Sequence, residues 1–293
     1  MHYREYEVWH DECKNNSFQH GILFIPSDKK LELLSYLKQI RNEFNVPFYE
    51  DHKFAGCLKK EKYGRLIYSH LTLLSHILKS KVKHSSFLRN ISGKSLYYRN
   101  YTPYLELADF FGCKFGFLSN ENYLRSFNCS SYSKKVELTF KFILKGCCHS
   151  FFSNKNPIII SSFHFDGYKH LGASFDKSYL TNIFLRSYCE LSSALYIDSK
   201  HFVDRDEDSK LIMNFVDNAV SGFSAAITCA SDPYNILTPL NDIISRARSK
   251  KTFVNPNSEW FRSASFSQVE IINNSITFSD LFKNKDQIVF DFY

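Results

Sequence analysis

The chain has 293 residues, of which 44% are hydrophobic and 17% aromatic, and it carries a formal net charge of +7. A chain of this length and apolar content can bury the core of one large domain or two ordinary ones, which excludes a disordered protein. Its 10 Gly and 7 Pro exclude a collagen-like or linker-rich protein. Because neither a signal peptide nor a run of about 18 apolar residues is visible, we expect a cytoplasmic protein without membrane spans.

The N-terminal region predicts two strands followed by an amphipathic helix. Residues 3–11 and 18–26 are rich in aromatic and β-branched residues, and Pro at position 26 ends the second strand. Ser27 and Asp28 can cap a helix over 29–44. The apolar face of this helix would consist of Leu31, Leu34, Leu37 and Ile40.

The middle of the chain is harder to interpret. Residues 62–84 predict a helix, and its His70 and His76 are six apart, so we interpret them as surface or satisfied core histidines rather than metal ligands. Residues 85–150 suggest a helical or irregular insertion. Within it, residues 136–149 fit either a helix or a strand by their periodicity.

The second half of the chain resumes an alternating pattern of strands and helices. The clearest strand is Pro157–Phe165, which ends at Asp166-Gly167. The elements expected after it are a helix over 176–189, a strand over 195–198, a helix over 208–230, a helix over 237–249 and a strand over 269–272. We therefore predict an α/β protein with one domain over 1–232, including the insertion, and a C-terminal extension over 233–293 packed on it.

Four acidic residues are candidates for a common site, and three of them stand at positions where a carboxylate is costly. Asp11 and Asp166 end predicted strands, and Asp217 lies inside an apolar helix stripe, where Asp is a poor helix former. Glu50 lies in a predicted loop, where its neighbour Asp51 is an alternative. Asp217 could also be a boundary residue whose carboxylate reaches water, and 30 acids in the chain offer many chance quartets.

If the fold brings the four acids together, their carboxylates would suit two Mg²⁺ or Mn²⁺ ions, because hard cations prefer oxygen ligands. Such a pair of ions supports phosphodiester hydrolysis: one activates water and the other stabilises the leaving oxygen. The eight cysteines contribute no zinc-binding spacing, and we expect buried free thiols.

Positive charge is concentrated in residues 29–100, which hold 15 Lys and Arg against 5 Asp and Glu, a net charge of +10. Lys53, Lys59 and Lys60 lie in this region. A basic segment attracts phosphate groups and binds nucleic acid independently of sequence. A solvated helix surface that keeps the protein soluble is the alternative interpretation.

The local motifs resemble the DUF3800 family. His10-Asp11-Glu12-Cys13 is similar to that family's opening Asp-Glu-Ser, and Glu50-Asp51-His52-Lys53 to its Glu-x-His/Lys segment. Phe163–Gly167 resembles its central strand and Asp-Gly, and Asp208–Gly222 its closing helix. Cys13 stands in place of the usual Ser, and Asn218 in place of the usual Leu. The resemblance covers residues 5–54 and 157–225.

The resemblance implies a ribonuclease H-like fold, a mixed sheet with flanking helices, and a metal-dependent nuclease. It implies the metal ligands Asp11, Glu50, Asp166 and Asp217, with Glu12 and Asp51 in reserve. Lys210 would contact phosphate, and His164 or His170 could transfer protons.

We therefore expect a Mg²⁺- or Mn²⁺-dependent nuclease that acts on RNA or DNA, with a possible protein partner or homo-oligomer. The first alternative is a non-catalytic module of the same fold that binds nucleic acid or protein. The second is a structural or assembly protein that uses exposed aromatic residues.

Overall fold

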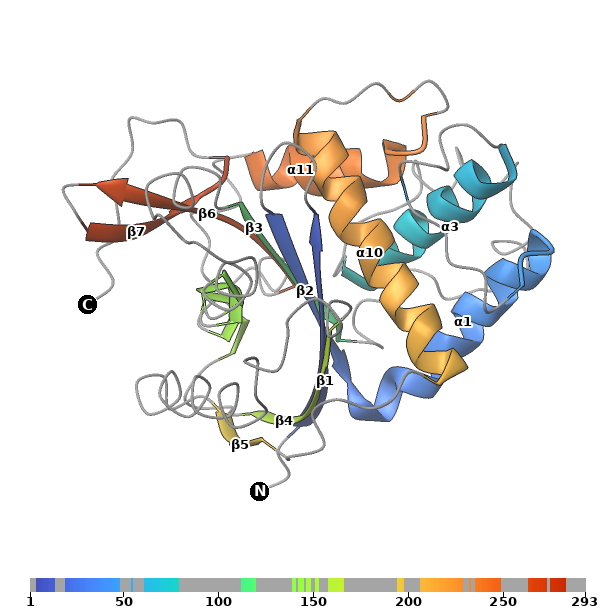
Figure 1. Cartoon of the computed structure of the whole chain (residues 1–293), viewed down its shortest axis with the longest axis horizontal. Helices are drawn as coiled ribbons and strands as arrows, with labels where there is room; N and C mark the ends of the chain where they lie inside the picture. Colours follow the sequence, from blue (N-terminus) through green and yellow to red (C-terminus); the bar gives the residue numbers. More distant parts are fainter. Residues whose placement is uncertain are drawn as a thin grey trace, which may run out of the picture.

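The protein is built on a mixed β-sheet (Figure 1). The computed structural model describes residues 4–13, 19–47, 54, 61–78, 112–119, 139–140, 142–144, 146–148, 151–152, 158–165, 194–197, 206–228, 232, 235–248, 263–272 and 275–282. The seven strands in these residues are β1 (Arg4–Cys13), β2 (Gln19–Pro26), β3 (Lys114–Ser119), β4 (Ile158–Phe165), β5 (Ala194–Ile197), β6 (Ala264–Ile272) and β7 (Ser275–Asp280).

The strand order is β5-β4-β1-β2-β3-β6-β7, so β1 and β2 lie near the middle. β1 pairs antiparallel with β2 and parallel with β4, and β2 pairs antiparallel with β3. β4 and β5 are parallel, as are β3 and β6, whereas β6 and β7 form an antiparallel pair at the edge. This sheet with its helices confirms the predicted α/β class.

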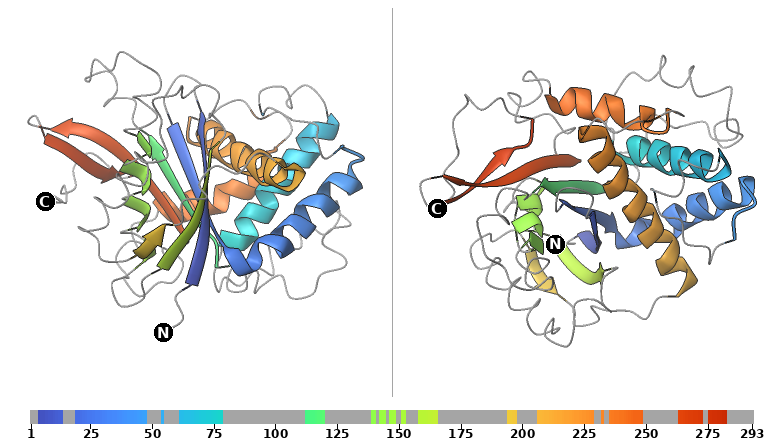
Figure 2. Two further views of the ribbon diagram at one scale, coloured as in Figure 1. Left: turned by 60° about the horizontal axis from the view of Figure 1, so that its bottom comes forward. Right: turned by 45° about the horizontal axis from the view of Figure 1, so that its top comes forward.

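Four long helices cover one face of the sheet (Figure 2). They are α1 (Lys30–Glu43), α3 (Glu61–Leu78), α10 (Glu207–Ile227) and α11 (Thr238–Arg248). We call this the helical face. The described helical residues between 139 and 151 cover the opposite face and settle the ambiguity of 136–149 in favour of a helix. No helix in the described parts of the chain is long and apolar enough to cross a membrane.

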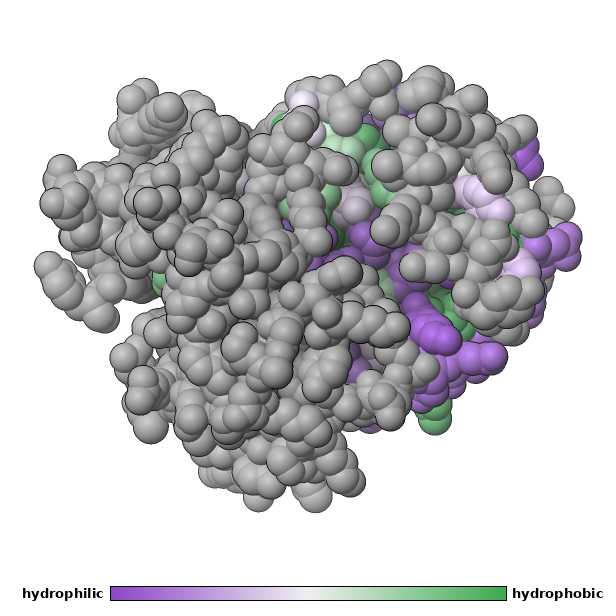
Figure 3. Space-filling view, in the orientation of Figure 1, coloured by the Kyte–Doolittle hydropathy of each residue, from purple (hydrophilic) through white to green (hydrophobic). Residues whose placement is uncertain are grey.

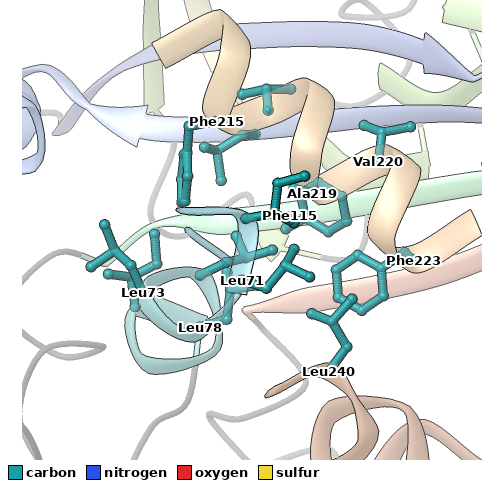
Figure 4. Packing of buried hydrophobic residues seen from close by; sticks show 14 of the residues in the cluster. Leu71, Leu73, Leu78, Phe115, Phe215, Ala219, Val220, Phe223 and Leu240 are labelled. Carbon is teal, nitrogen blue, oxygen red and sulfur yellow. The ribbon is translucent and has the colours of Figure 1, made fainter. Parts of the chain in front are cut away.

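The core has two parts that correspond to the two sheet faces. On the helical face, α10 packs its Phe215, Ala219 and Phe223 among side chains of α3, α11 and β3 (Figure 4). Phe115 of β3 stacks on Phe223 with the ring centroids 5.1 Å apart. On the opposite face, Tyr6, Val8 and Phe24 pack against apolar residues of the 139–151 segment. Burial of apolar area on both faces is what stabilises this sheet.

Some expectations for the N-terminal elements were wrong in detail. Asp11 does not end a strand, because the antiparallel ladder continues two residues further, to the Cys13–Gln19 pair. Ser27 makes no capping hydrogen bond to the helix. A 3-10 turn (Ser27–Lys29) precedes α1 instead, and Ser27 Oγ lies 3.0 Å from Ser161 Oγ of β4.

The apolar face of α1 is also rotated from the predicted one. Leu31 is 75% exposed, whereas Leu33, one of the residues omitted from the prediction, is fully buried. The buried side chains recur at helical spacing along Leu33, Leu34, Leu37, Ile40 and Arg41. His70 and His76 of α3 are buried, so of the two alternatives for them, surface or core residues, the structure supports the core.

The region expected as an insertion contributes to the sheet. β3 lies between β2 and β6, so residues 114–119 belong to the framework of the protein. β6 and β7 of the C-terminal extension continue the same sheet, and β7 is a strand that the pattern did not predict. The helix expected over 176–189 lies outside the described residues.

Candidate functional site

Asp11 lies on the helical face of the sheet. Side chains alternate along β1, and its neighbours at a spacing of two, Trp9 and Cys13, belong to the helical-face core. Asp11 is only 4% exposed, and its Oδ1 accepts a 2.8 Å hydrogen bond from the backbone N–H of Glu12. A buried carboxylate needs partners that compensate for its lost hydration, and its oxygens are donors of the kind that hard cations prefer.

Asp217 lies in the middle of α10, on the side next to its apolar stripe. The flanking residues Val216 and Asn218 are fully buried, whereas Asp217 is half-buried. Its Oδ1 accepts a 3.2 Å hydrogen bond from the hydroxyl of Ser221, one turn later. The carboxylate is therefore held on the helix surface and retains access to its surroundings.

α10 crosses the helical face of the sheet next to Asp11. Gly21 is the cross-strand partner of Asp11, and a Cβ added at Gly21 would overlap Cγ2 of Val220. Cross-strand partners present their side chains on the same face and lie about 4.5–5.5 Å apart. Asp217 precedes Val220 by three residues, about one helical turn. Asp11 and Asp217 thus belong to two elements that pack against each other at this point.

A row of polar side chains continues from Asp11 along β1 and β4. Glu7 pairs in register with Ser162, and Trp9 with His164, on the helical face. The His164 ring stacks on Trp9 at a centroid distance of 3.6 Å and an angle of 3°. Glu7 Oε2 lies 3.2 Å from His164 Nε2 and 3.0 Å from Lys30 Nζ of α1. Glu7 therefore joins two strands and a helix.

The electrostatics of Glu7 reflect its two basic neighbours. Burial raises the pKa of the Glu7 carboxyl, but hydrogen bonds from His164 and Lys30, together with their positive charges, outweigh burial and hold this pKa below its usual value. Ser162 Oγ lies 2.9 Å from Nε2 of His164, the same nitrogen that faces Glu7. A serine–histidine–acid relay needs both ring nitrogens, so this group is not a hydrolytic triad.

Two of the four predicted ligands lie within the described residues, Asp11 and Asp217. Glu50, Asp51 and Asp166 lie outside them. The parallel pairing of β1 and β4 extends to His10–Phe165, and Asp166 is the next residue in the chain. Among the described residues alone, no group of three or more His, Cys, Asp or Glu could hold a metal ion.

Of the predicted phosphate-binding residues, Lys210 lies within the described part of the chain. It is exposed on α10, seven residues before Asp217. Residues seven apart lie on nearly the same side of a helix, about 10 Å apart along its axis. Hydrophilic residues gather around the first turns of α10 and the neighbouring part of α1 (Figure 3). Lys53, Lys59, Lys60 and His170 lie outside the described residues.

Glu7, Trp9 and Lys30 were not predicted as neighbours of the candidate site. The signal was present in the alternation of β1, which places Glu7, Trp9 and Asp11 on one face. The buried His10–His20 pair on the opposite face was not predicted either; Nε2 of His10 lies 2.8 Å from Nδ1 of His20 there. The start of α10 was predicted one residue late, because its N-cap is Asp206, whose Oδ1 accepts the N–H of Ser209 at 2.6 Å.

Comparisons with protein-family models, with curated proteins and with solved structures find no match for this chain. The geometry of the helical face is therefore the basis for a functional assignment.

Proposed function

We propose that the protein is a metal-dependent nuclease that hydrolyses phosphodiester bonds of RNA or DNA at the helical face, with Asp11 and Asp217 as metal ligands. The observation that supports this most is the crossing of α10 over the Asp11–Gly21 pair, with Asp217 one turn from the contact. Two carboxylates on elements that pack against each other would supply two ligands of an acidic metal site. Glu50 and Asp166 are the further ligands that we propose from the sequence.

The pairing of β1 with β4 supports the inclusion of Asp166. The ladder extends to the pair His10–Phe165, and Asp166 follows Phe165 directly in the sequence.

The two described acids fit Mg²⁺ or Mn²⁺. Both provide the hard oxygen donors that these cations prefer, and a bound cation would add to the hydrogen bonding that the buried Asp11 carboxylate already has. A pair of such ions, when bound, activates a water molecule and stabilises the leaving oxygen of the phosphodiester. In the protein, Asp11 and Asp217 would hold the cations in position, and Lys210 would contact a backbone phosphate from the exposed side of α10.

We further propose that the fold is ribonuclease H-like and that the chain is a member of the DUF3800 family, and the arrangement around β1 supports this proposal. The central β1 has an antiparallel partner on one side and a parallel partner on the other, and long helices cover the face that carries the acids. A mixed sheet with flanking helices is what this resemblance implies.

Cleavage assays test the proposal. We expect the purified protein to cut labelled single- or double-stranded RNA or DNA with Mg²⁺ or Mn²⁺ and to lose this activity in chelator. Asp11→Asn and Asp217→Asn should each lower the rate at least about 100-fold, because each removes a ligand charge and leaves the side-chain shape nearly unchanged. Glu207→Gln is the matched control, since this acid is exposed on the same helix.

The proposal fails if wild-type protein shows no metal-dependent cleavage above that of the Asp11→Asn/Asp217→Asn double variant. Metal-independent binding of nucleic acid, with affinity that falls steeply with salt, would instead favour a non-catalytic binding module.

A further inference from the structure

A buried polar network joins three helices of the helical face. Nη2 of Arg41, on α1, donates a 2.9 Å hydrogen bond to Oδ1 of Asn214 on α10. Nδ2 of Asn218 lies 3.4 Å from the same oxygen and 2.9 Å from Nδ1 of His70 on α3. All four side chains are at most 5% exposed. The network therefore lies inside the apolar core, between α1, α3 and α10.

Net stability is a poor explanation for a guanidinium and two amides in this environment. Buried ionic and polar groups carry a large desolvation cost, and a well-packed apolar set of similar volume is often at least as stable. The core of the helical face is apolar, and the Phe215 ring lies edge-on to His70 with the ring centroids 5.7 Å apart. The polar groups instead fix the relative orientation of the helices, because hydrogen bonds require a particular alignment whereas apolar contacts do not.

The network contacts α10 on both sides of Asp217. Asn214 precedes Asp217 by three residues and Asn218 follows it directly. The apolar residues of α10 alone would permit a small rotation or sliding of the helix across the sheet. Hydrogen bonds from α1 and α3 to these two asparagines restrict both motions at the turn that carries the acid.

Arg41 also holds the chain that follows α1. Its Nη1 donates a 2.6 Å hydrogen bond to the carbonyl oxygen of Pro47. Between them, Asn45 adopts a positive φ of 50°, and the N–H of Val46 donates to the carbonyl of Arg41 at 2.9 Å. One buried guanidinium therefore links the turn after α1 directly to α10.

We propose that the network of Arg41, His70, Asn214 and Asn218 sets the rotation and axial position of α10 and thereby directs Asp217 toward the face of β1 that carries Asp11. These four are positioning residues. The structural part of this inference stands on the hydrogen bonds, and its consequence for metal binding rests on the proposed function.

Paired apolar replacements separate positioning from stability. Arg41→Met or Asn214→Leu alone removes the buried Arg41–Asn214 hydrogen bond but keeps one of its two polar groups, so each should lower the midpoint of urea unfolding. In the double variant neither polar group remains, and the midpoint should return toward that of the wild type. The Mn²⁺ dissociation constant of the double variant should nevertheless rise about 10–100-fold, the range for residues that orient metal ligands. Its crystal structure should show α10 rotated or shifted against β1.

A surface pair between the same two helices provides the control. Lys38 Nζ of α1 lies 2.6 Å from Oδ1 of Asp208 on α10, with both side chains about 40% exposed. Lys38→Met/Asp208→Leu should leave the Mn²⁺ affinity unchanged, because exposed ion pairs contribute little. If the first double variant does not fold, His70→Leu/Asn218→Leu removes the other half of the network and permits the same comparison.

Native Mn²⁺ affinity together with an unmoved α10 in a folded double variant would overturn the inference. A displaced α10 in a protein whose wild type binds no Mn²⁺ would support the positioning role and refute the proposed function. If neither double variant folds, the network is required for folding itself, and the positioning proposal is wrong.

Discussion

The two faces of β1 carry different kinds of titratable side chain. On the helical face, Glu7 is paired with Lys30 and His164, and Asp11 accepts a backbone N–H. On the opposite face, His10 and His20 contact each other among apolar residues, with Phe140 edge-on to His10. Anions are thus stabilised on one side of a single strand, whereas uncharged imidazoles are favoured on the other.

Burial makes the His10–His20 pair sensitive to acid. It lowers the pKa of His10 to about 3, and burial together with the neighbouring His10 lowers the pKa of His20 well below the usual 6.5. The unfolded chain takes up protons near pH 6.5 and the folded pair does not. The stability from this pair is therefore complete above about pH 6.5 and is lost as the pH falls toward the folded pKa values.

We expect the free energy of unfolding to fall by about 2–3 kcal/mol between pH 7.5 and 5.5 because of these two histidines, at about 1.4 kcal/mol per histidine for each pH unit below 6.5. Urea unfolding at both pH values measures this loss. The His10→Leu/His20→Leu variant lacks both histidines, so its free energy of unfolding should fall by about 2–3 kcal/mol less than that of the wild type over the same pH interval. An equal loss in the variant would show that other groups cause the pH dependence.

At the scale of elements, the contact between α10 and β2 depends on the absence of a side chain at Gly21. Val220 takes the space that a Cβ at Gly21 would occupy. The ring edge of Phe115 would lie 3.2 Å from that Cβ. This close approach brings α10 near Asp11, the partner of Gly21. The helix position therefore depends on one glycine as well as on the buried network.

Gly21→Ala should lower the free energy of unfolding by about 1–3 kcal/mol through overpacking against Val220. Thermal or urea unfolding measures the loss, and adding Val220→Ala should recover part of it by making room. Gly146→Ala is the matched control, because nothing lies within 4 Å of its added Cβ and Ala is a better helix former. Equal effects of the two single changes would contradict close packing at Gly21.

At the scale of the whole molecule, local patterns predicted most elements, and long-range contacts account for what they missed. The alternation of β1 and β2 and the apolar stripes of α3 and α10 are local signals, and those elements appear where expected. β3 lies in the region predicted as a helical or irregular insertion, and its Gly116 lies where a Cβ would overlap Cys147 Sγ from the 139–151 segment. That requirement arises between distant parts of the chain and leaves no periodic pattern.

The candidate site was predictable to a similar degree. The placement of Asp11 and Asp217 in apolar elements marked them as unusual residues, and the structure puts them on elements that pack together. Glu50 and Asp166 remain predictions, since they lie outside the described residues. The network that contacts α10 could not be inferred from spacing, because Arg41, His70 and Asn214 come from three separate helices.

Titration of the protein with Mn²⁺, followed by calorimetry or by the paramagnetic resonance of free Mn²⁺, tests the proposed site most directly. We predict that the wild type binds Mn²⁺, that Asp11→Asn and Asp217→Asn each weaken binding about tenfold or more, and that Glu207→Gln binds like the wild type. Unaltered Mn²⁺ affinity in both Asn variants, or no binding by the folded wild type at millimolar Mn²⁺, would contradict a metal site formed by Asp11 and Asp217.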